Sequence, residues 1–180
     1  MYPQKPELRR RLKAQLKEHT PLAPEKSAKI CQAIRHDAPW KSASTVAIFA
    51  PLPGEPDLLS LCPAPGKRML FPRISGPDLL WIEVTNPIED LLAAPDAKIR
   101  LLEPVPGPSV ALSEIDLLLI PGLAFSKSGG RLGRGGGYYD RALSAKHPST
   151  RVMGVCFAFQ LQDSIPLEPH DQLVDGLFYA

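Results

Sequence analysis

Short apolar runs, each closed by a turn residue, constrain the fold of this chain most strongly. The clearest is Ile115–Ile120, which ends at Pro121-Gly122, and Thr45–Ala50 ends in the same way at Pro51. Runs of this length without polar alternation are typical of parallel strands buried on both faces. We expect further strands at 68–71 (ended by Pro72), 79–84, 151–157 and 173–179.

Helical periodicity separates these strands. Leu8, Leu12 and Leu16 recur every four residues and predict a helix from about Lys5 to His19. A second helix is expected from about Pro24, with Ala28, Cys31, Ile34 and Ala38 on one stripe, and a third over 138–146. Short helices are expected near 57–61 and 89–94, the latter within an irregular, Pro-rich segment 86–110. Alternating strands and helices indicate an α/β sheet with helices on both faces.

Length, charge and cysteine spacing exclude several classes of protein. With 180 residues, no internal repeat and no evident linker, residues 1–180 are expected to form a single domain. The formal net charge of +2 provides no global field for nucleic acid, and no apolar run approaches membrane-spanning length. The three cysteines lie far apart without a CxxC pair, and the start MYPQKPELRRRLK lacks the apolar core of a signal peptide. We therefore expect a cytoplasmic protein without nucleic-acid or membrane partners.

A glycine-rich segment, Ser126–Gly137, carries the strongest chemical signal. It follows a predicted strand and precedes a predicted helix, the position at which open α/β sheets bind ligands. Its glycines allow backbone N–H groups to approach a ligand, and Arg131 and Arg134 add forked cations suited to phosphate. The Walker A pattern is absent, and Tyr138 stands where a dinucleotide fingerprint would need glycine. The segment predicts an anion site; the alternative is a flexible glycine hairpin with solvated arginines.

The stretch PGLAFSKSGGRLGRGGGYYDRAL resembles the signature of the 5-formyltetrahydrofolate cyclo-ligase family. The resemblance extends over most of the chain in the order of the family. Its further landmarks are Lys5-Pro-Glu-Leu-Arg9, Phe49-Ala-Pro-Leu-Pro-Gly-Glu55, Phe71-Pro-Arg73, Glu103-Pro104, Gln160, Pro166 and His170-Asp171-Gln-Leu-Val-Asp175. It implies a three-layer α/β fold with a mainly parallel sheet.

The resemblance also implies a reaction. The formyl oxygen of 5-formyltetrahydrofolate, with or without a polyglutamate tail, attacks the γ-phosphate of ATP, with Mg²⁺ as the metal. The N10 nitrogen then closes the ring and phosphate leaves. The products are 5,10-methenyltetrahydrofolate, ADP and phosphate. Such chemistry needs no covalent nucleophile, and the chain offers no convincing Ser–His–Asp or Cys–His arrangement.

Site roles follow from the resemblance residue by residue. Catalytic roles fall to Arg134 and Asp140. ATP binding falls to Lys5, Arg9, Arg131, Gly133, Arg134, Gly135, Gly136, Gly137, Tyr138 and Tyr139. Folate binding falls to Ala50, Glu55, Arg134, Gly135, Gly136, Gly137 and Tyr138. Mg²⁺ binding falls to Asp140 and Asp171, because magnesium prefers hard oxygen ligands.

Simpler interpretations of these residues remain. Lys5 and Arg9 share one helix face and could be plain solvated charge, and Asp140 and Asp171 could be ordinary first-turn and turn residues. Ala50 and Tyr139 could be packing. Trp81 and Phe125 are expected in the core.

One departure from the family pattern concerns the loop charge. Many members carry Lys where this chain has Gly136, so one phosphate cation is missing; Arg134, Lys127 or Lys5 is expected to supply it. Two other functions stay open: another small-molecule ATP-dependent ligase or kinase, and a non-catalytic folate-binding protein. A monomer is expected.

Overall fold

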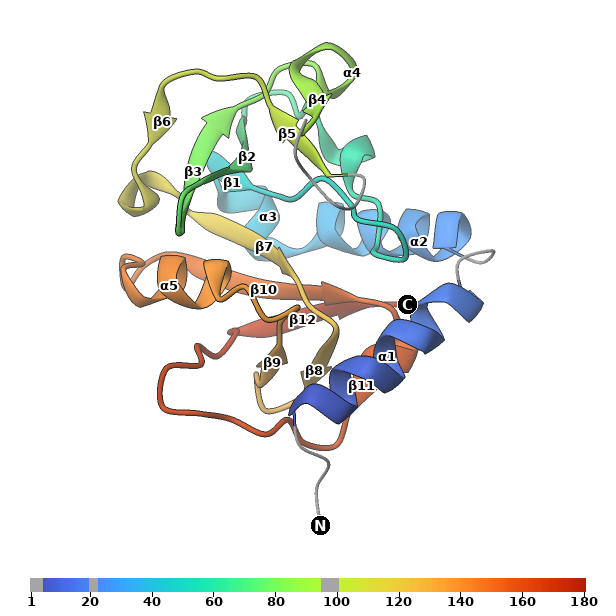
Figure 1. Ribbon diagram of the computed structural model, residues 1–180. Helices are drawn as coiled ribbons and strands as arrows, with labels where there is room; N and C mark the ends of the chain where they lie inside the picture. Colours follow the sequence, from blue (N-terminus) through green and yellow to red (C-terminus); the bar gives the residue numbers. More distant parts are fainter. Residues whose placement is uncertain (1–4, 20–22, 95–100) are drawn as a thin grey trace.

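A seven-stranded sheet with the order β12-β10-β7-β1-β2-β3-β6 organises the computed structural model, which describes residues 5–19, 23–94 and 101–180 (Figure 1). The first five strands are parallel: β12 (Gly176–Tyr179), β10 (Arg151–Cys156), β7 (Leu117–Pro121), β1 (Thr45–Ala47) and β2 (Arg68–Ser75). β3 (Asp78–Glu83) pairs antiparallel with β2, and β6 (Ser109–Val110) pairs antiparallel with β3. The expected α/β class with a mainly parallel sheet is confirmed.

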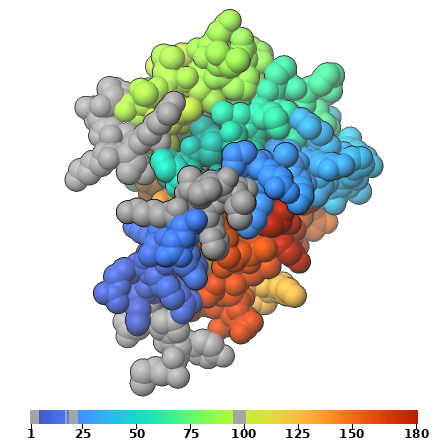
Figure 2. All heavy atoms as spheres, turned by 90° about the vertical axis from the view of Figure 1, so that its right-hand side faces the viewer, coloured from blue at the N-terminus to red at the C-terminus, as the bar shows by residue number. Residues whose placement is uncertain are grey.

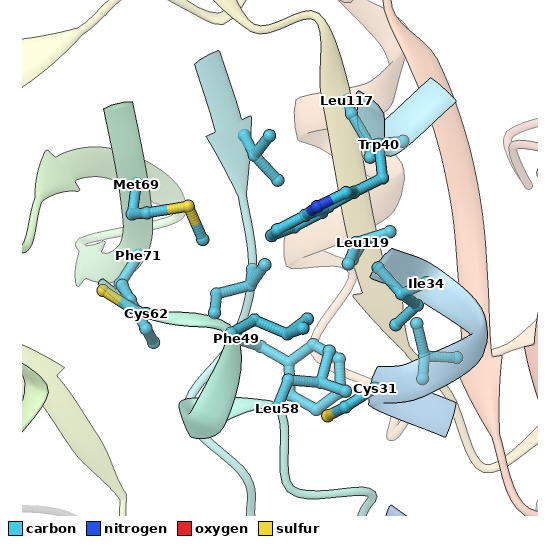
Figure 3. Close-up of a cluster of buried hydrophobic side chains, with 14 of the residues drawn as sticks. Cys31, Ile34, Trp40, Phe49, Leu58, Cys62, Met69, Phe71, Leu117 and Leu119 are labelled. Atoms are coloured by element: carbon cyan, nitrogen blue, oxygen red, sulfur yellow. The ribbon is translucent and has the colours of Figure 1, made fainter. Parts of the chain in front are cut away.

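Helices cover both faces of this sheet and make the expected three layers. On one face, α2 (Ala23–His36) and α3 (Ala38–Ser42) bury Ile34 and Trp40 against sheet residues such as Leu117 and Leu119 (Figure 3). On the other face, α5 (Tyr138–Ser144) packs Leu143 into a second cluster. The continuous apolar runs of β7 and β10 are buried because both of their faces are covered.

Helix α1 (Lys5–His19) has the predicted bounds but does not cover the main sheet. Its stripe of Leu8, Leu12 and Leu16 packs on a small three-stranded sheet of β11 (Leu161–Gln162), β8 (Ala124–Ser126) and β9 (Arg131–Leu132). In the space-filling view, α1 lies beside the C-terminal part of the chain, drawn in orange and red (Figure 2). This packing brings the basic face of α1 toward the glycine-rich segment.

Several predicted boundaries were wrong. β2 continues through Pro72 to Ser75, because β1 pairs only with residues up to Leu70 and Pro72 lies beyond that ladder. β1 ends at Ala47, although residues 48–50 stay buried. β12 begins only at Gly176, and α5 ends at Ser144, since Ala145 N–H turns back to the carbonyls of Ala142 and Leu143.

The second helix and segment 86–110 also differ from expectation. α2 ends at His36, before Ala38. Ala28 and Ala38 are exposed, and Ile30, Cys31 and Ile34 form the buried apolar stripe of the helix. Segment 86–110 contains α4 (Pro87–Asp90), the antiparallel pair β4 (Leu91–Ala93) and β5 (Leu102–Pro104), and strand β6. Near residue 57, only a 3-10 turn, η2 (Leu59–Leu61), forms. Two further 3-10 turns are η3 (Leu112–Glu114) and η4 (Ala158–Gln160).

A turn at Gly54 ties α1 to the sheet and yields a stability prediction. Gly54 has φ +84°, and a Cβ there would lie 3.2 Å from Leu16 Cβ. Gly66 has φ +75° with nothing near its Cβ position, so it is the matched control. We expect Gly54→Ala to lower the free energy of unfolding by about 2 kcal/mol and Gly66→Ala by about 1 kcal/mol. Equal losses in urea melts would show that α1 does not crowd this turn.

Candidate active site

A cavity of about 260 Å³ lies at the carboxyl edge of the sheet. Its wall is formed where β1, β2 and β7 end, and by the loop that precedes α5. The lining residues are Phe49, Ala50, Leu52, Glu55, Pro72, Ile74, Leu79, Leu101, Leu102, Glu103, Pro121, Gly122, Arg131, Gly133, Arg134, Gly136, Gly137, Tyr138, Tyr139 and Asp140. The lining combines apolar side chains with two arginine–carboxylate pairs, a composition that suits an organic ring joined to a polar group.

Glu55 and Arg134 form the first charged pair of the cavity. Arg134 Nε and Nη2 each lie 2.8 Å from Glu55 Oε1, and Leu52 N–H donates to Glu55 Oε2 at 3.0 Å. The Glu55 side chain is 3% exposed and that of Arg134 is 30% exposed. Burial raises the pKa of the Glu55 carboxyl above its ordinary value, and the charge of Arg134 opposes that rise.

Arg131 and Asp140 form the second pair, which lies deeper. Arg131 Nη2 donates to Asp140 Oδ1 at 2.9 Å, and Arg131 Nη1 donates to the Pro121 carbonyl at 3.3 Å. The Arg131 side chain is only 3% exposed, because β9 carries it into the interior. Its guanidinium carbon lies 5.5 Å from the centre of the Tyr139 ring. Arg131 is therefore a buried cation held from three sides.

Lys5 and Asp171 form a third pair outside the cavity lining. Lys5 Nζ donates to Asp171 Oδ2 at 2.6 Å and lies 3.2 Å from Glu168 Oε2. Ligand atoms of Glu168, His170 and Asp171 all lie within 4.8 Å of one another. Burial alone would raise the pKa of Asp171, but the bonds from Lys5 and from Glu168 N–H outweigh it and hold the pKa below its ordinary value.

Arg9 fastens α1 to the glycine-rich loop. Its Nε donates to the Gly133 carbonyl at 3.0 Å, and its guanidinium carbon lies 3.9 Å from where a Gly135 Cβ would stand. Gly135 has φ +109°, a conformation that other residues rarely adopt. The contact therefore links α1 to the glycine-rich loop at Gly133 and Gly135.

The two tyrosines that follow the loop have different environments. Tyr138 lines the cavity, and its ring is flanked by Arg141, whose guanidinium carbon lies 5.1 Å from the ring centre and whose Nε donates to the Pro77 carbonyl. Tyr139 packs against Trp81, with ring centres 6.4 Å apart, and burial raises its pKa. Tyr139 thus combines the packing role with a place in the cavity wall.

The structure brings together most of the residues singled out from the sequence. Around the cavity lie Ala50, Glu55, Arg131, Gly133, Arg134, Gly136, Gly137, Tyr138, Tyr139 and Asp140. Lys5, Arg9, Gly135 and Asp171 are not in its lining. Lys127 lines a separate surface hollow with residues 174–177. Among the candidates for the missing loop charge, Arg134 is therefore the one that faces the cavity.

Sequence reasoning missed the apolar wall. It consists of Phe49, Leu52, Ile74, Leu79, Leu101 and Leu102, and Glu103 adds a buried carboxylate that accepts from Ile74 N–H. The sequence marks Glu103 only as part of the family landmark Glu103-Pro104. Trp81 and Phe125 are buried in the core, as expected. None of the described helices is long and apolar enough to span a membrane.

A protein family and several of its members resemble this chain. The 5-formyltetrahydrofolate cyclo-ligase family matches residues 1–180. A 5-formyltetrahydrofolate cyclo-ligase of Mycolicibacterium smegmatis is 35% identical over 72% of this chain and 70% of its own length. One from Escherichia coli is 33% identical over 74% and 76%.

Solved structures agree. A 5,10-methenyltetrahydrofolate synthetase from Aquifex aeolicus superposes with a TM-score of 0.80 at 30% identity, covering 97% of this chain and 89% of the other. One from Mycoplasma pneumoniae, at 22% identity, shares the fold with a TM-score of 0.74 and 98% coverage of both chains. This chain therefore belongs to the 5-formyltetrahydrofolate cyclo-ligase family.

Proposed function

We propose that this protein is a 5-formyltetrahydrofolate cyclo-ligase that uses ATP to convert 5-formyltetrahydrofolate into 5,10-methenyltetrahydrofolate, with release of ADP and phosphate. The observation that carries the proposal is the cavity, whose lining combines apolar side chains with two arginine–carboxylate pairs. Family membership supplies the reaction, and the cavity supplies a place for a ring system beside a phosphate group.

The reaction balances without a covalent enzyme intermediate. The formyl oxygen attacks the γ-phosphorus of ATP, the bond to ADP breaks, and an imidate phosphate forms. The N10 nitrogen attacks the activated carbon, and phosphate leaves with the former formyl oxygen. Because the chemistry lies in the substrates, the protein has to orient them and to neutralise charge on the transferred phosphoryl group.

The apolar half of the cavity is proposed to hold the folate. Phe49 and Leu79 provide apolar, water-excluding contacts, and the small Ala50 side chain leaves room at the end of the sheet. Glu55 offers a buried carboxylate to the N–H edge of the pterin. Tyr138, flanked by Arg141, is placed to contact a ring from the side of the loop.

The loop half is proposed to hold the triphosphate. Arg134 lines the cavity with a partly exposed guanidinium, and Gly136 and Gly137 leave backbone uncovered beside it. Arg131 is more deeply buried and contributes its charge from behind. The proposed ATP site extends toward α1, because the family resemblance also assigns ATP binding to Lys5, Arg9, Gly133, Gly135 and Tyr139.

Magnesium is proposed as the accompanying metal, held by Asp140 and Asp171. Both fit a hard cation, because each is a carboxylate with an oxygen beyond the one that its lysine or arginine partner engages. Asp140 lines the cavity, whereas Asp171 belongs to the cluster beside Lys5. Bound Mg²⁺ would neutralise phosphate charge; Arg131 and Lys5 hold the two carboxylates in place.

Gly136 allows a test of the missing loop charge. A Cβ at Gly136 would lie 2.8 Å from the Tyr138 ring, so any side chain there displaces the ring. The comparison must therefore be made with Gly136→Ala. We expect Gly136→Lys to bind ATP about two- to fivefold more tightly than Gly136→Ala, as one exposed charge provides. Equal KM values for ATP in the two variants would remove the reason for regarding this cation as missing.

A panel of acceptors tests the proposal against other ATP-dependent enzymes. ADP release is measured with 5-formyltetrahydrofolate, 10-formyltetrahydrofolate, folic acid and formylated amines. ADP release that requires 5-formyltetrahydrofolate supports the cyclo-ligase, and faster release with another acceptor contradicts it. We also propose that the protein is a cytoplasmic monomer of one domain. Its partner is then a small folate, not a nucleic acid or a membrane.

A further inference from the structure

The ion pair between Glu55 and Arg134 joins two groups that the two substrates need separately. Under the proposed function, Glu55 serves the folate and Arg134 serves the phosphates, yet each is the partner of the other, with Nε and Nη2 both 2.8 Å from Oε1. If the folate alone engages Glu55, Arg134 loses its partner, and if the phosphates alone engage Arg134, Glu55 loses its partner. This competition has consequences for how the two substrates bind.

Glu55 is the fixed member of the pair. Its side chain is 3% exposed, its Oε2 accepts from Leu52 N–H at 3.0 Å, and its own N–H donates to the Leu52 carbonyl at 2.9 Å. The preceding Gly54 lies close to α1, since a Cβ there would stand 3.2 Å from Leu16 Cβ. A carboxylate held in this way cannot turn toward solvent, so it keeps its place when Arg134 leaves.

Arg134 is the movable member. It stands between Gly133 and Gly135, and its side chain is 30% exposed. Within the described parts of the chain, Glu55 is its only hydrogen-bonding or ion-pairing partner. Arg131 differs, because it is 3% exposed and is also held by the Pro121 carbonyl. Of the two cavity arginines, Arg134 is the one free to change partners.

A buried carboxylate gives up its cation at low cost only when another donor replaces it. The 2-amino-4-oxopyrimidine edge of a reduced folate presents two adjacent N–H donors, as a guanidinium does. We propose that Glu55 acts as the counter-ion of Arg134 until the folate binds, and that the folate edge then replaces the guanidinium and releases Arg134 to the phosphates of the nucleotide. The inference rests on the proposed function and adds a coupling between its two substrates.

Coupling of this kind is reciprocal. If the folate frees Arg134 for the nucleotide, the nucleotide must raise the affinity for the folate by the same factor. Without folate, the nucleotide must compete with Glu55 for Arg134 and therefore binds more weakly. The arrangement keeps the triphosphate site incomplete until an acceptor is present, which limits wasteful hydrolysis.

Nucleotide binding without folate tests the exchange directly. The dissociation constant of Mg-adenylyl imidodiphosphate is measured calorimetrically for the wild type, Glu55→Gln, Arg134→Ala and the double variant. Glutamine keeps the size of Glu55 but removes its charge, so we expect Glu55→Gln to bind the analogue about five- to tenfold more tightly than the wild type. Arg134→Ala should bind more weakly, and in its background Glu55→Gln should have no effect.

Glu103→Gln is the matched control. Glu103 is a buried carboxylate in the same cavity wall, but it accepts from Ile74 N–H and lies 3.9 Å from Arg73 instead of contacting Arg134. We expect its analogue affinity to stay within about twofold of the wild type. Equal tightening by Glu55→Gln and Glu103→Gln would show a general charge effect and overturn the exchange, as would unchanged binding by Glu55→Gln.

A second measurement, on the wild type, tests the exchange even if Glu55→Gln fails to fold. Saturating 5-formyltetrahydrofolate should tighten analogue binding about five- to tenfold, and Arg134→Ala should abolish this effect. Tightening that persists in Arg134→Ala would overturn the exchange. Failure of the proposed function looks different: the wild type would then form no methenyl product, whatever its analogue affinity.

Discussion

Replacing Arg134 by alanine is expected to lower kcat/KM for ring closure by about 100- to 1000-fold, the usual loss when one charge-stabilising donor of an active site is removed. Arg134 is the more exposed of the two cavity arginines, and it stands between two glycines of the loop. Steady-state kinetics with varied ATP should show a fall in kcat as well as a rise in KM, because charge on the transferred phosphoryl group develops in the transition state.

Arg134→Lys separates charge from geometry. Lysine keeps the cation but not the forked guanidinium, so we expect it to recover about a tenth of the wild-type kcat/KM. Melting curves of both variants are needed as well, because Arg134→Ala leaves Glu55 buried without its cation. A folded Arg134→Ala variant that keeps more than about one fifth of wild-type kcat/KM would refute the phosphate role.

Replacing Asp140 by alanine is expected to damage both stability and activity. The Arg131 side chain is 3% exposed and loses its only carboxylate partner in the described structure, while Asp140 itself is 17% exposed. Removing one member of a buried pair costs about 3–5 kcal/mol, and we expect about 3 kcal/mol here because Asp140 reaches the cavity. Urea unfolding measures the loss, and ring closure should fall below detection.

Asp140→Asn and a double variant test whether the unpaired Arg131 charge causes the loss of stability. Asparagine keeps an acceptor for Arg131 but not the charge, so about half of the stability loss is expected. Removing the buried cation as well, in Asp140→Ala with Arg131→Met, should recover stability but not activity. A loss below about 1 kcal/mol in Asp140→Ala would show that Arg131 does not depend on this carboxylate.

The parts of the fold that follow from local sequence were predicted well. The α1 bounds match because Leu8, Leu12 and Leu16 set a helical stripe, and the buried strands match because β7 and β10 are covered on both faces. Boundaries that depend on neighbours were not predictable. Pro72 sits inside β2 only because β1 is too short to reach it, a fact that lies in the pairing of strands and not in either segment.

The same division holds for the candidate site. The loop signature brought Arg131, Arg134 and Asp140 to attention, and the structure gathers them at one cavity. Their pairing could not be predicted, because Glu55 meets Arg134 across 79 positions of sequence and Lys5 meets Asp171 across 166. The apolar wall is assembled from ends of separate strands, so no single stretch of sequence carries its signal.

The most direct test of the account is the ring closure itself. Purified protein is mixed with Mg-ATP and 5-formyltetrahydrofolate, and the near-ultraviolet absorbance of the methenyl product is followed, with ADP measured in the same sample. The account predicts absorbance that grows only with both ATP and protein, with one ADP per ring closed as the reaction requires. A flat trace from folded protein that binds the folate would contradict it and leave a folate-binding protein in its place.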